Sequence, residues 1–420
     1  MKRNPLFSML LCVLTIAFIA PLALFEKSAG AYPPPQHQVE TPMATDERLE
    51  VPGWWPTKQS ASLDDFVGTK ECARCHAKIV ATQLETPMAR AASLPADSNS
   101  LREHERLVHQ AGPYTFTVSK DGASRIYTVS DGLRTISAPL GWAFGVGNKG
   151  VTYVFWRNGA FYESQMSFFV SLQSLDLTPG HSPKTPPTID MALGQPLDPE
   201  IVRRCFGCHT TASTTKAGFH PSGLVLGVDC EACHGPGAKH ADLMDAEKNS
   251  EGRQAIFNPG TLGPVAQVDF CGACHRTSYD VLETKIRSVE DVRFQPYRLE
   301  KSRCWGEGDA RLTCIACHDP HQPLNHDPAA YDAKCLACHA SSSSLDRRSP
   351  DRPLSQDHPG KASFGTADHQ IGSSRPAKAC PVASKNCVTC HMPRVQVPSM
   401  HSPFVDHRIR IVRPNSPYPD

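Results

Sequence analysis

Residues 230–234 have the sequence Cys-Glu-Ala-Cys-His, and their pattern, Cys-x-x-Cys-His, occurs seven times in this chain of 420 residues. Two thiols about one helical turn apart, followed directly by an imidazole, are the pattern for attachment of c-type haem. The thiols bond to the porphyrin and the histidine becomes the proximal iron ligand. We therefore expect seven covalently bound haem c groups. The motifs are Cys72, Cys75 and His76; Cys205, Cys208 and His209; Cys230, Cys233 and His234; Cys271, Cys274 and His275; Cys314, Cys317 and His318; Cys335, Cys338 and His339; and Cys387, Cys390 and His391.

Cysteine pairs of this spacing also occur in zinc ribbons and in redox dithiols. Neither of these sites needs a histidine directly after every pair, and neither predicts seven pairs in an exported chain. Haem attachment takes place outside the cytoplasm, which agrees with the export signal described next. The pattern therefore favours haem over zinc.

The N-terminus has the features of a secretory signal. Two basic residues at 2–3 precede an apolar run at 6–25, and residues 29–31, Ala-Gly-Ala, form a small-residue cleavage site. We expect residues 1–31 to be a signal peptide and residues 32–65 to be a proline-rich tether. The alternative is an uncleaved anchor, because the run has about 20 residues. The chain is then expected to be exported, either periplasmic or at the cell surface.

The charge balance excludes a strongly basic nucleic-acid binder, since 43 Lys and Arg residues face 42 Asp and Glu residues. Removing the signal leaves 40 basic and 41 acidic residues. Haem propionates would bring the net charge of the oxidised protein to about −8, which favours redox partners with basic docking surfaces.

Hydrophobic residues make up 40% and aromatic residues 7%. We expect porphyrin faces to fill part of the interior, so that the protein does not fold without haem.

Enough histidines remain to supply a distal ligand for every iron. Excluding the motifs and His37 in the tether, eleven are left: His104, His109, His181, His220, His240, His321, His326, His358, His369, His401 and His407. Seven are the candidate distal ligands: His240, His407, His321, His220, His401, His109 and His104. Met88 is an alternative ligand for the first haem, and one haem without a distal ligand could bind a small substrate. No catalytic side chain is predicted.

Two cysteines belong neither to a motif nor to the signal, namely Cys304 and Cys380. In an oxidising compartment two leftover cysteines are most simply a disulfide. Two free thiols are the alternative.

The first two motifs are separated by a long stretch without cysteine that has β character. Residues 114–118 and 125–129 alternate between apolar and polar around a turn at 120–122. Residues 151–155 and 160–162 flank a second turn at 157–159, which ends in Asn-Gly. Ser167 to Val170 could add a strand or begin a helix. This stretch could be a scaffold or a docking surface for a partner.

The predicted fold class is mostly α and irregular, organised by haem, with a small antiparallel β insertion at 110–175 between the first and second motifs. We expect the first haem and the β-rich segment in residues 66–200 and a six-haem domain in residues 201–420. Short helices at the motifs should be joined by irregular loops, the longest at residues 341–386.

Four segments resemble the bacterial multihaem cytochromes c related to the tetrahaem carrier of ammonia oxidisers. They are Phe66 to Cys72, Gly227 to Gly237, Cys387 to Pro393, and Asp406 to Ile409. The wider superfamily includes octahaem hydroxylamine oxidoreductase and pentahaem nitrite reductase. The resemblance implies that the histidine after Gly-Pro-Gly, His240, and the C-terminal His407 ligate neighbouring haems.

Together these features predict an exported heptahaem c-type cytochrome that relays single electrons through closely packed, mostly bis-His haems. One alternative is a reductase or oxidase of small nitrogen or sulfur species at one open haem iron. Another is a subunit of a conducting filament, which would self-associate. Membrane attachment is expected only through an uncleaved N-terminal anchor.

Overall fold

The computed structural model describes residues 62–145, 147–215, 218–219, 221, 223–285, 287–305, 308–339, 380, 382–413 and 418. All of them belong to one compact unit, residues 41–420. The predicted signal, most of the tether, His220, His358, His369 and nearly all of the loop at 341–386 lie outside the described residues. The proposed division at residue 200 stays a prediction. Within the described ranges, no helix is both long and apolar enough to cross a membrane.

A four-stranded antiparallel sheet contains the first predicted hairpin, and its strand order is β2-β3-β4-β5. The strands are β2 (Arg106–Ala111), β3 (Tyr114–Asp121), β4 (Ser124–Ser130) and β5 (Thr135–Pro139). Every second residue of β3 is buried from Tyr114 to Val118, as the alternation predicted. The turn between β3 and β4 contains Gly122 at a φ of 57°, a conformation that glycine adopts without strain.

A seven-stranded sheet contains the second predicted hairpin, β7–β8, whose turn has Asn158 and Gly159 at positive φ. The order is β1-β6-β7-β8-β11, and β9 pairs with both β7 and β10. Residues 166–169 form a strand rather than a helix. Strands also occur before residue 110 and after residue 175, so the β-rich segment is larger than the expected 110–175. Its strands are β1 (Ala92–Ser93), β6 (Trp142–Phe144), β7 (Gly150–Arg157), β8 (Ala160–Ser164), β9 (Met166–Phe169), β10 (Ser174–Leu177) and β11 (Gly194–Pro196).

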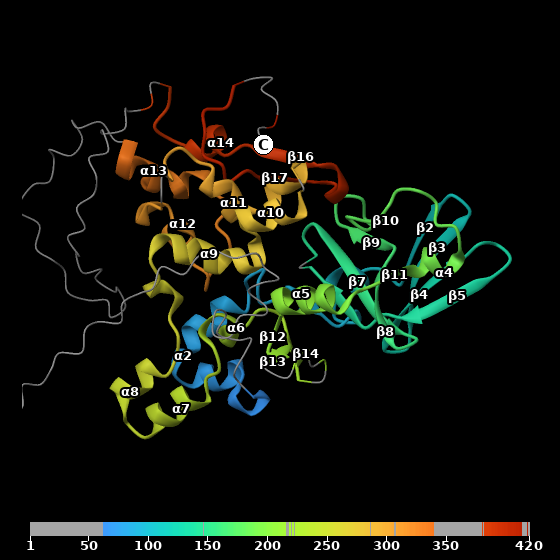
Figure 1. Ribbon diagram of the computed structural model, residues 1–420, viewed down its shortest axis with the longest axis horizontal. Coiled ribbons are helices and arrows are strands. Elements are labelled where there is room, and N and C mark those ends of the chain that lie inside the picture. Colours follow the sequence, from blue (N-terminus) through green and yellow to red (C-terminus); the bar gives the residue numbers. More distant parts are fainter. Residues whose placement is uncertain are drawn as a thin grey trace, which may run out of the picture. The chain divides into compact units, whose positions relative to one another are not determined.

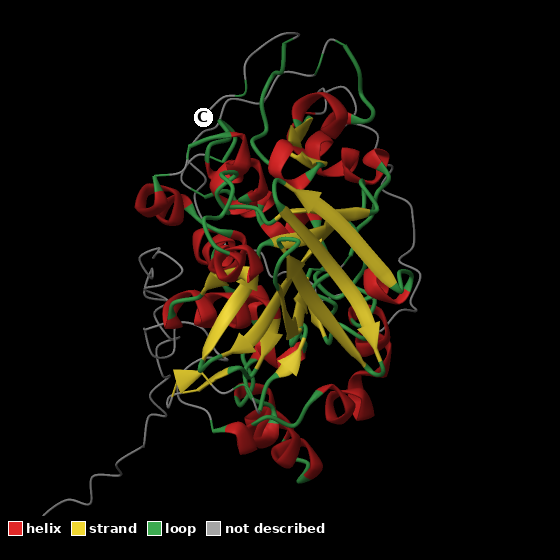
Figure 2. Ribbon diagram, turned by 90° about the vertical axis from the view of Figure 1, so that its right-hand side faces the viewer, coloured by secondary structure: helices red, strands yellow, loops and turns green. Residues whose placement is uncertain are grey.

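The two sheets pack face to face around an ordinary hydrophobic core (Figure 2). Tyr127 from the four-stranded sheet lies 6.4 Å from Phe155 of the seven-stranded sheet, measured between ring centroids. Both side chains are fully buried, as are Phe116 and Phe168. Helix α4 (Ile189–Leu193) adds Ile189 to this core. This part of the chain therefore has an interior that does not depend on a cofactor, and the expectation that the protein does not fold without haem is narrowed to the motif-bearing region.

Each motif lies on a helix or at the end of one, as predicted (Figure 1). The motif helices are α2 (Thr69–Gln83), α5 (Pro199–His209), α6 (Cys230–His234), α9 (Pro264–His275), α12 (Cys314–Cys317), α13 (Asp332–His339) and α14 (Cys387–His391). Four other helices belong to this part: α7 (Ala238–Asp245), α8 (Asn249–Gln254), α10 (Ser278–Thr284) and α11 (Gln295–Glu300). A short helix, α3 (Asn99–Arg102), precedes β2.

Short strand pairs and glycine turns complete the haem-motif region. The pairs are β12 (Thr210–Thr211) with β15 (Val225–Leu226), β13 (Thr214–Thr215) with β14 (Gly218–Phe219), and β16 (Arg394–Val397) with β17 (Ser402–Val405). Helix α6 ends at His234 because Gly235 adopts a φ of 78°, and α7 begins after Gly237. The Gly-Pro-Gly sequence thus breaks the helix after the third motif, as expected.

The interior of the motif-bearing region differs from the β core. Its hydrophobic clusters are small, one around Phe270 and another around Val268, Leu299 and Trp305. A buried ion pair, Arg298 with Asp406, lies beside them. So small an apolar interior agrees with a region whose remaining volume is filled by cofactors.

This contrast predicts the behaviour of a chain made without haem, for example with all motif cysteines replaced by alanine. The β sandwich should resist trypsin because its core is complete, whereas the region after Pro199 should be digested. Limited proteolysis with mass spectrometry of the fragments measures this, with the haem-loaded chain as the control. A single cooperative melt of the whole haem-free chain would contradict the expectation.

Candidate haem centres

Three motif histidines have a hydrogen bond at Nδ1 that leaves Nε2 available for metal binding. In each of them Nδ1 lies within hydrogen-bond distance of a backbone carbonyl: His209 with Ala91 (3.0 Å), His234 with Phe257 (2.8 Å) and His391 with Arg410 (2.8 Å). Because a carbonyl oxygen only accepts, Nδ1 must carry the proton and the Nε2 lone pair stays free. This arrangement is typical of histidines that bind metal.

Two histidines outside the motifs have the same hydrogen bond. Nδ1 of His240 donates to the carbonyl of Gly252 over 2.8 Å, and Nδ1 of His407 donates to that of Val405 over 3.1 Å. Both were predicted as distal ligands, and both keep Nε2 free. Nε2 of both is therefore available to a metal ion, and their role as distal ligands stays a prediction.

Two pairs of histidine rings are spaced as if one iron lay between them. The ring centroids of His318 and His407 are 6.3 Å apart, and those of His234 and His321 are 5.9 Å apart. Two imidazoles that bind one metal ion from opposite sides have centroids about 6 Å apart, because each metal–nitrogen bond is about 2 Å long. The described residues thus fit a haem at the fifth motif and another at the third.

Burial favours the neutral form of four histidines in this region. It lowers the pKa of His234, His275 and His318, and it lowers the pKa of His407 to about 4. A neutral imidazole has a lone pair to offer to iron at pH 7, whereas an imidazolium has none.

Within the described ranges, no three His, Cys, Asp or Glu side chains gather into a metal-binding group. Burial raises the pKa of Cys205 to about 12 and that of Cys233 to about 11, whereas the neighbouring Cys72 lowers the pKa of Cys230 to about 7. The preference for haem over zinc therefore rests on the histidine that follows every cysteine pair.

The fold brings six of the seven motifs together in pairs, through the first cysteine of each. In each pair the two motif helices are in contact, and the two thiols lie close enough to shift each other's pKa: Cys72 with Cys230, Cys271 with Cys314, and Cys335 with Cys387. The first motif therefore meets the third, the fourth meets the fifth, and the sixth meets the seventh. Only the last two of these pairs join consecutive motifs.

Glu231 joins the first motif to the third. Its buried carboxylate accepts hydrogen bonds from the backbone N–H groups of Val67 (3.0 Å), Gly68 (2.9 Å) and Gly237 (2.7 Å). Val67 and Gly68 directly precede α2, so one carboxylate fixes the start of the first motif helix and the turn after the third. Asp229 adds a hydrogen bond from the Thr69 hydroxyl at 2.8 Å.

Asp332 joins the sixth motif to the seventh in a similar way. The carboxylate, at the start of α13, accepts from the backbone N–H of Asn386 (2.7 Å) and of Cys387 (2.8 Å), where α14 begins. These hydrogen bonds lower the pKa of Asp332. Neither carboxylate was predicted from the sequence. Glu231 stands between the two cysteines of a motif, where an acidic residue usually faces solvent.

The pairs are themselves connected. Cys233 of the third motif packs in one cluster with Phe270, Ala273 and Cys274 of α9. The thiol of Cys208, in the second motif, approaches the carbonyl of Ala273 at 3.6 Å. The ring of His318 lies 5.7 Å from that of Tyr331, which directly precedes α13, so the fifth motif lies near the sixth. All seven motifs therefore form one connected set, in which the fourth touches the second, third and fifth.

The seven-stranded sheet packs on the helix of the second motif. The Phe206 ring on α5 lies 5.2 Å from that of Trp142 and 5.1 Å from that of Phe144. A scaffold is one of the two roles expected for the β-rich segment, and the structure shows packing of this kind at the second motif.

Other predicted ligands have different surroundings. His104 lies beside Gln173 (3.2 Å) and His109 lies on β2, both within the β-rich segment. His401 pairs with Asp176 through Nε2 at 3.0 Å. Met88 is half-buried, and its carbonyl accepts from the N–H of Val228. His220 lies outside the described residues.

Cys304 and Cys380 are exposed free cysteines in the structure. The pairing of Cys304 with Cys380 in a disulfide stays a prediction.

Known proteins share parts of this chain. Residues 181–235, which include the second and third motifs, match the family described as cytochrome c554 and c-prime. The high-molecular-weight cytochrome c of Nitratidesulfovibrio vulgaris (strain Hildenborough) is 25% identical over an aligned part that covers 36% of this chain. These matches support a multihaem cytochrome c. The chain spans about a third of the length of that relative, 32%. The narrower superfamily of the resemblance stays a prediction.

Among solved structures, that of the outer cell wall cytochrome OcwA resembles this chain with a TM-score of 0.44 and 14% identity. The similarity covers 83% of this chain and 80% of the other.

The replacement Glu231→Gln should destabilise the haem-loaded protein by about 2 kcal/mol, because hydrogen bonds to a charged acceptor contribute about 1.5–3 kcal/mol. Thermal denaturation followed by circular dichroism measures the loss. The control is Glu85→Gln, an exposed position where the change should be within about 0.5 kcal/mol. Equal stability of the two variants would contradict the role given to Glu231.

Proposed function

We propose that this chain is an exported heptahaem cytochrome c that relays single electrons. The observation that carries the proposal is the connected set of motifs, in which each of the seven touches at least one other. Cofactors attached to touching motifs lie close together, and closely spaced haems exchange electrons. When bound, each haem iron supplies a site that accepts and releases one electron.

The chain's own residues define the ligands of two haems most directly. His318 and His407 would hold the fifth haem, and His234 and His321 would hold the third. The ring spacings, and the lowered pKa values of His234, His318 and His407, support this assignment. His240, with its oriented Nδ1, would ligate a neighbouring haem. Two histidines on one iron close both axial positions, which favours electron transfer over substrate binding.

The contacts between motifs suggest a route for electrons. It would run from the first motif through the third, fourth, fifth and sixth to the seventh, with the second joining at the fourth. The route is independent of the order of the motifs in the sequence. We propose that it operates outside the cytoplasm, in the periplasm or at the cell surface, between redox partners with basic docking surfaces.

The proposal predicts seven haems per chain, all or nearly all low-spin. Mass spectrometry of the purified protein counts the haems, and electron paramagnetic resonance during a redox titration gives their spin states. Ferrous protein should bind little carbon monoxide. A colourless protein containing zinc would refute the proposal, and one high-spin haem that reacts with nitrogen or sulfur compounds would favour a reductase.

Replacing the proposed distal ligand, His407→Gly, should convert one low-spin haem to high-spin. That haem should bind carbon monoxide, and added imidazole should restore the low-spin signal because it occupies the vacated position. His326→Gly is the control, since His326 is exposed and is given no ligand role. Unchanged spectra in His407→Gly would show that another residue ligates the fifth haem.

A further inference from the structure

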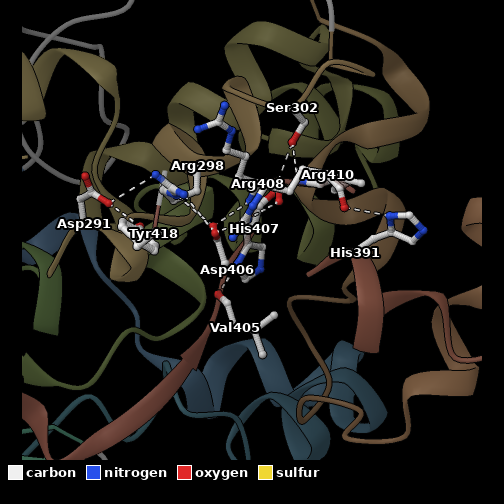
Figure 3. A network of polar contacts seen from close by, with 11 residues as sticks. Asp291, Arg298, Ser302, His391, Val405, Asp406, His407, Arg408, Arg410 and Tyr418 are labelled. Carbon is white, nitrogen blue, oxygen red and sulfur yellow. Dashed lines mark hydrogen bonds and ion pairs between the residues drawn. The ribbon is translucent and has the colours of Figure 1, made fainter. Parts of the chain in front are cut away.

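The segment 406–410 contacts two proposed haem centres although it belongs to no helix or strand (Figure 3). His407 faces His318 of the fifth motif. Three residues later, the carbonyl of Arg410 accepts the Nδ1 proton of His391 in the seventh motif, and the Arg410 N–H donates to the carbonyl of His391 at 3.1 Å. We call residues 406–410 the ligand strap. A shift of the strap would move His407 relative to His318 and the Arg410 carbonyl relative to His391.

A buried ion pair holds the strap. The guanidinium of Arg298, on α11, donates from Nε to Oδ1 of Asp406 at 2.9 Å and from Nη2 to Oδ2 at 3.0 Å. Both side chains are fully buried. A bidentate bond of this kind fixes direction as well as distance, because the guanidinium and the carboxylate are both planar. Asp406 immediately precedes His407, so the ion pair lies next to the proposed ligand.

The other side of Arg298 is also held. Its Nη1 lies 3.5 Å from Oδ1 of Asp291, which is fully buried and accepts the Tyr418 hydroxyl at 2.6 Å. The Tyr418 ring lies over the guanidinium, 4.5 Å from its carbon. The guanidinium is therefore enclosed between two carboxylates and an aromatic ring and has little freedom to move.

Further hydrogen bonds fix the rest of the strap. Asp406 also accepts from the N–H of Arg408 at 3.0 Å and from the side chain of Arg410. The hydroxyl of Ser302, two residues after the end of α11, accepts a hydrogen bond from the N–H of Ile409 at 2.8 Å. The Asp406 carboxylate accepts more of these hydrogen bonds than any other group of the strap. The buried guanidinium of Arg298 keeps this carboxylate in place.

We propose that Arg298 is a positioning residue for two haem ligands at once. It anchors Asp406, which sets His407 opposite His318, and through the strap it presents the Arg410 carbonyl to His391. The ligation of the fifth haem is thereby coupled to the hydrogen bonding of the proximal ligand of the seventh. The inference rests on the proposed function, because it assumes haems at both motifs.

The test compares haem-loaded Arg298→Met with Arg311→Met. Arg311 is an exposed arginine close to the fifth motif, paired with Asp309, so its loss removes the same charge without touching the strap. In Arg298→Met, one haem should become high-spin and bind carbon monoxide, imidazole should reverse this, and one further low-spin signal should shift. Electron paramagnetic resonance and ferrous carbon monoxide spectra measure these effects. Arg311→Met should keep the wild-type spectra.

Two results would overturn the inference: wild-type spectra in folded Arg298→Met, or equal changes in all haems, which would indicate general destabilisation. If Arg298→Met does not accumulate, Arg298→Lys decides, because it keeps the buried charge but lacks the bidentate geometry. Wild-type spectra in Arg298→Lys would then refute the inference. His407→Gly separates the two levels: its failure to give a high-spin haem contradicts the proposed ligation, whereas failure of the Arg298 variants alone contradicts only the positioning role.

Discussion

The main constraint on this protein is that several of its motif helices are too short to be stable by themselves. Helices α6 and α14 have five residues each and α12 has four. A helix of one turn does not form in water by its own hydrogen bonds, because nucleation is unfavourable. These three motif helices therefore depend on bonds from outside. The structure supplies some through buried carboxylates that accept backbone N–H groups at a helix start, as Glu231 does for α2 and Asp332 for α14. Covalent attachment of a cofactor would supply the rest.

The interior is divided between two kinds of stabilisation. The β sandwich buries a contiguous set of aromatic and aliphatic side chains, whereas the motif-bearing region buries charges and small apolar clusters. Buried charges are tolerated only when they are paired and hydrogen-bonded, because desolvation is costly. Arg298 satisfies this condition between Asp406 and Asp291. The second motif lies where the two regions meet, since Phe206 packs against the aromatic rings of the sheet.

The carboxylates and the ligand strap serve the same purpose in different places. Each connects backbone segments that are far apart in the chain: Glu231 bonds to Gly68, Asp332 to Cys387, and Arg298 to Asp406. A charged side chain with several partners holds such segments more rigidly than apolar contacts, since its hydrogen bonds have preferred directions. Rigid segments of this kind suit proximal and distal ligands, whose ring nitrogens must meet a metal ion from opposite sides.

The amino-acid sequence by itself determined the local features. The spacing of Cys230, Cys233 and His234 defines an attachment motif wherever it occurs, and the Asn-Gly turn at 158–159 predicts a hairpin from φ preferences alone. These signals need only neighbouring residues. The partners of each motif depended on the tertiary structure, because contacts such as Cys72 with Cys230, or Arg298 with Asp406, join positions more than 100 residues apart. No periodicity in the sequence encodes such a contact. The tertiary structure also decides which histidines have a free Nε2: that of His240 is free, whereas that of His401 binds Asp176. The sequence around a histidine does not show this difference, because the partners come from distant parts of the chain.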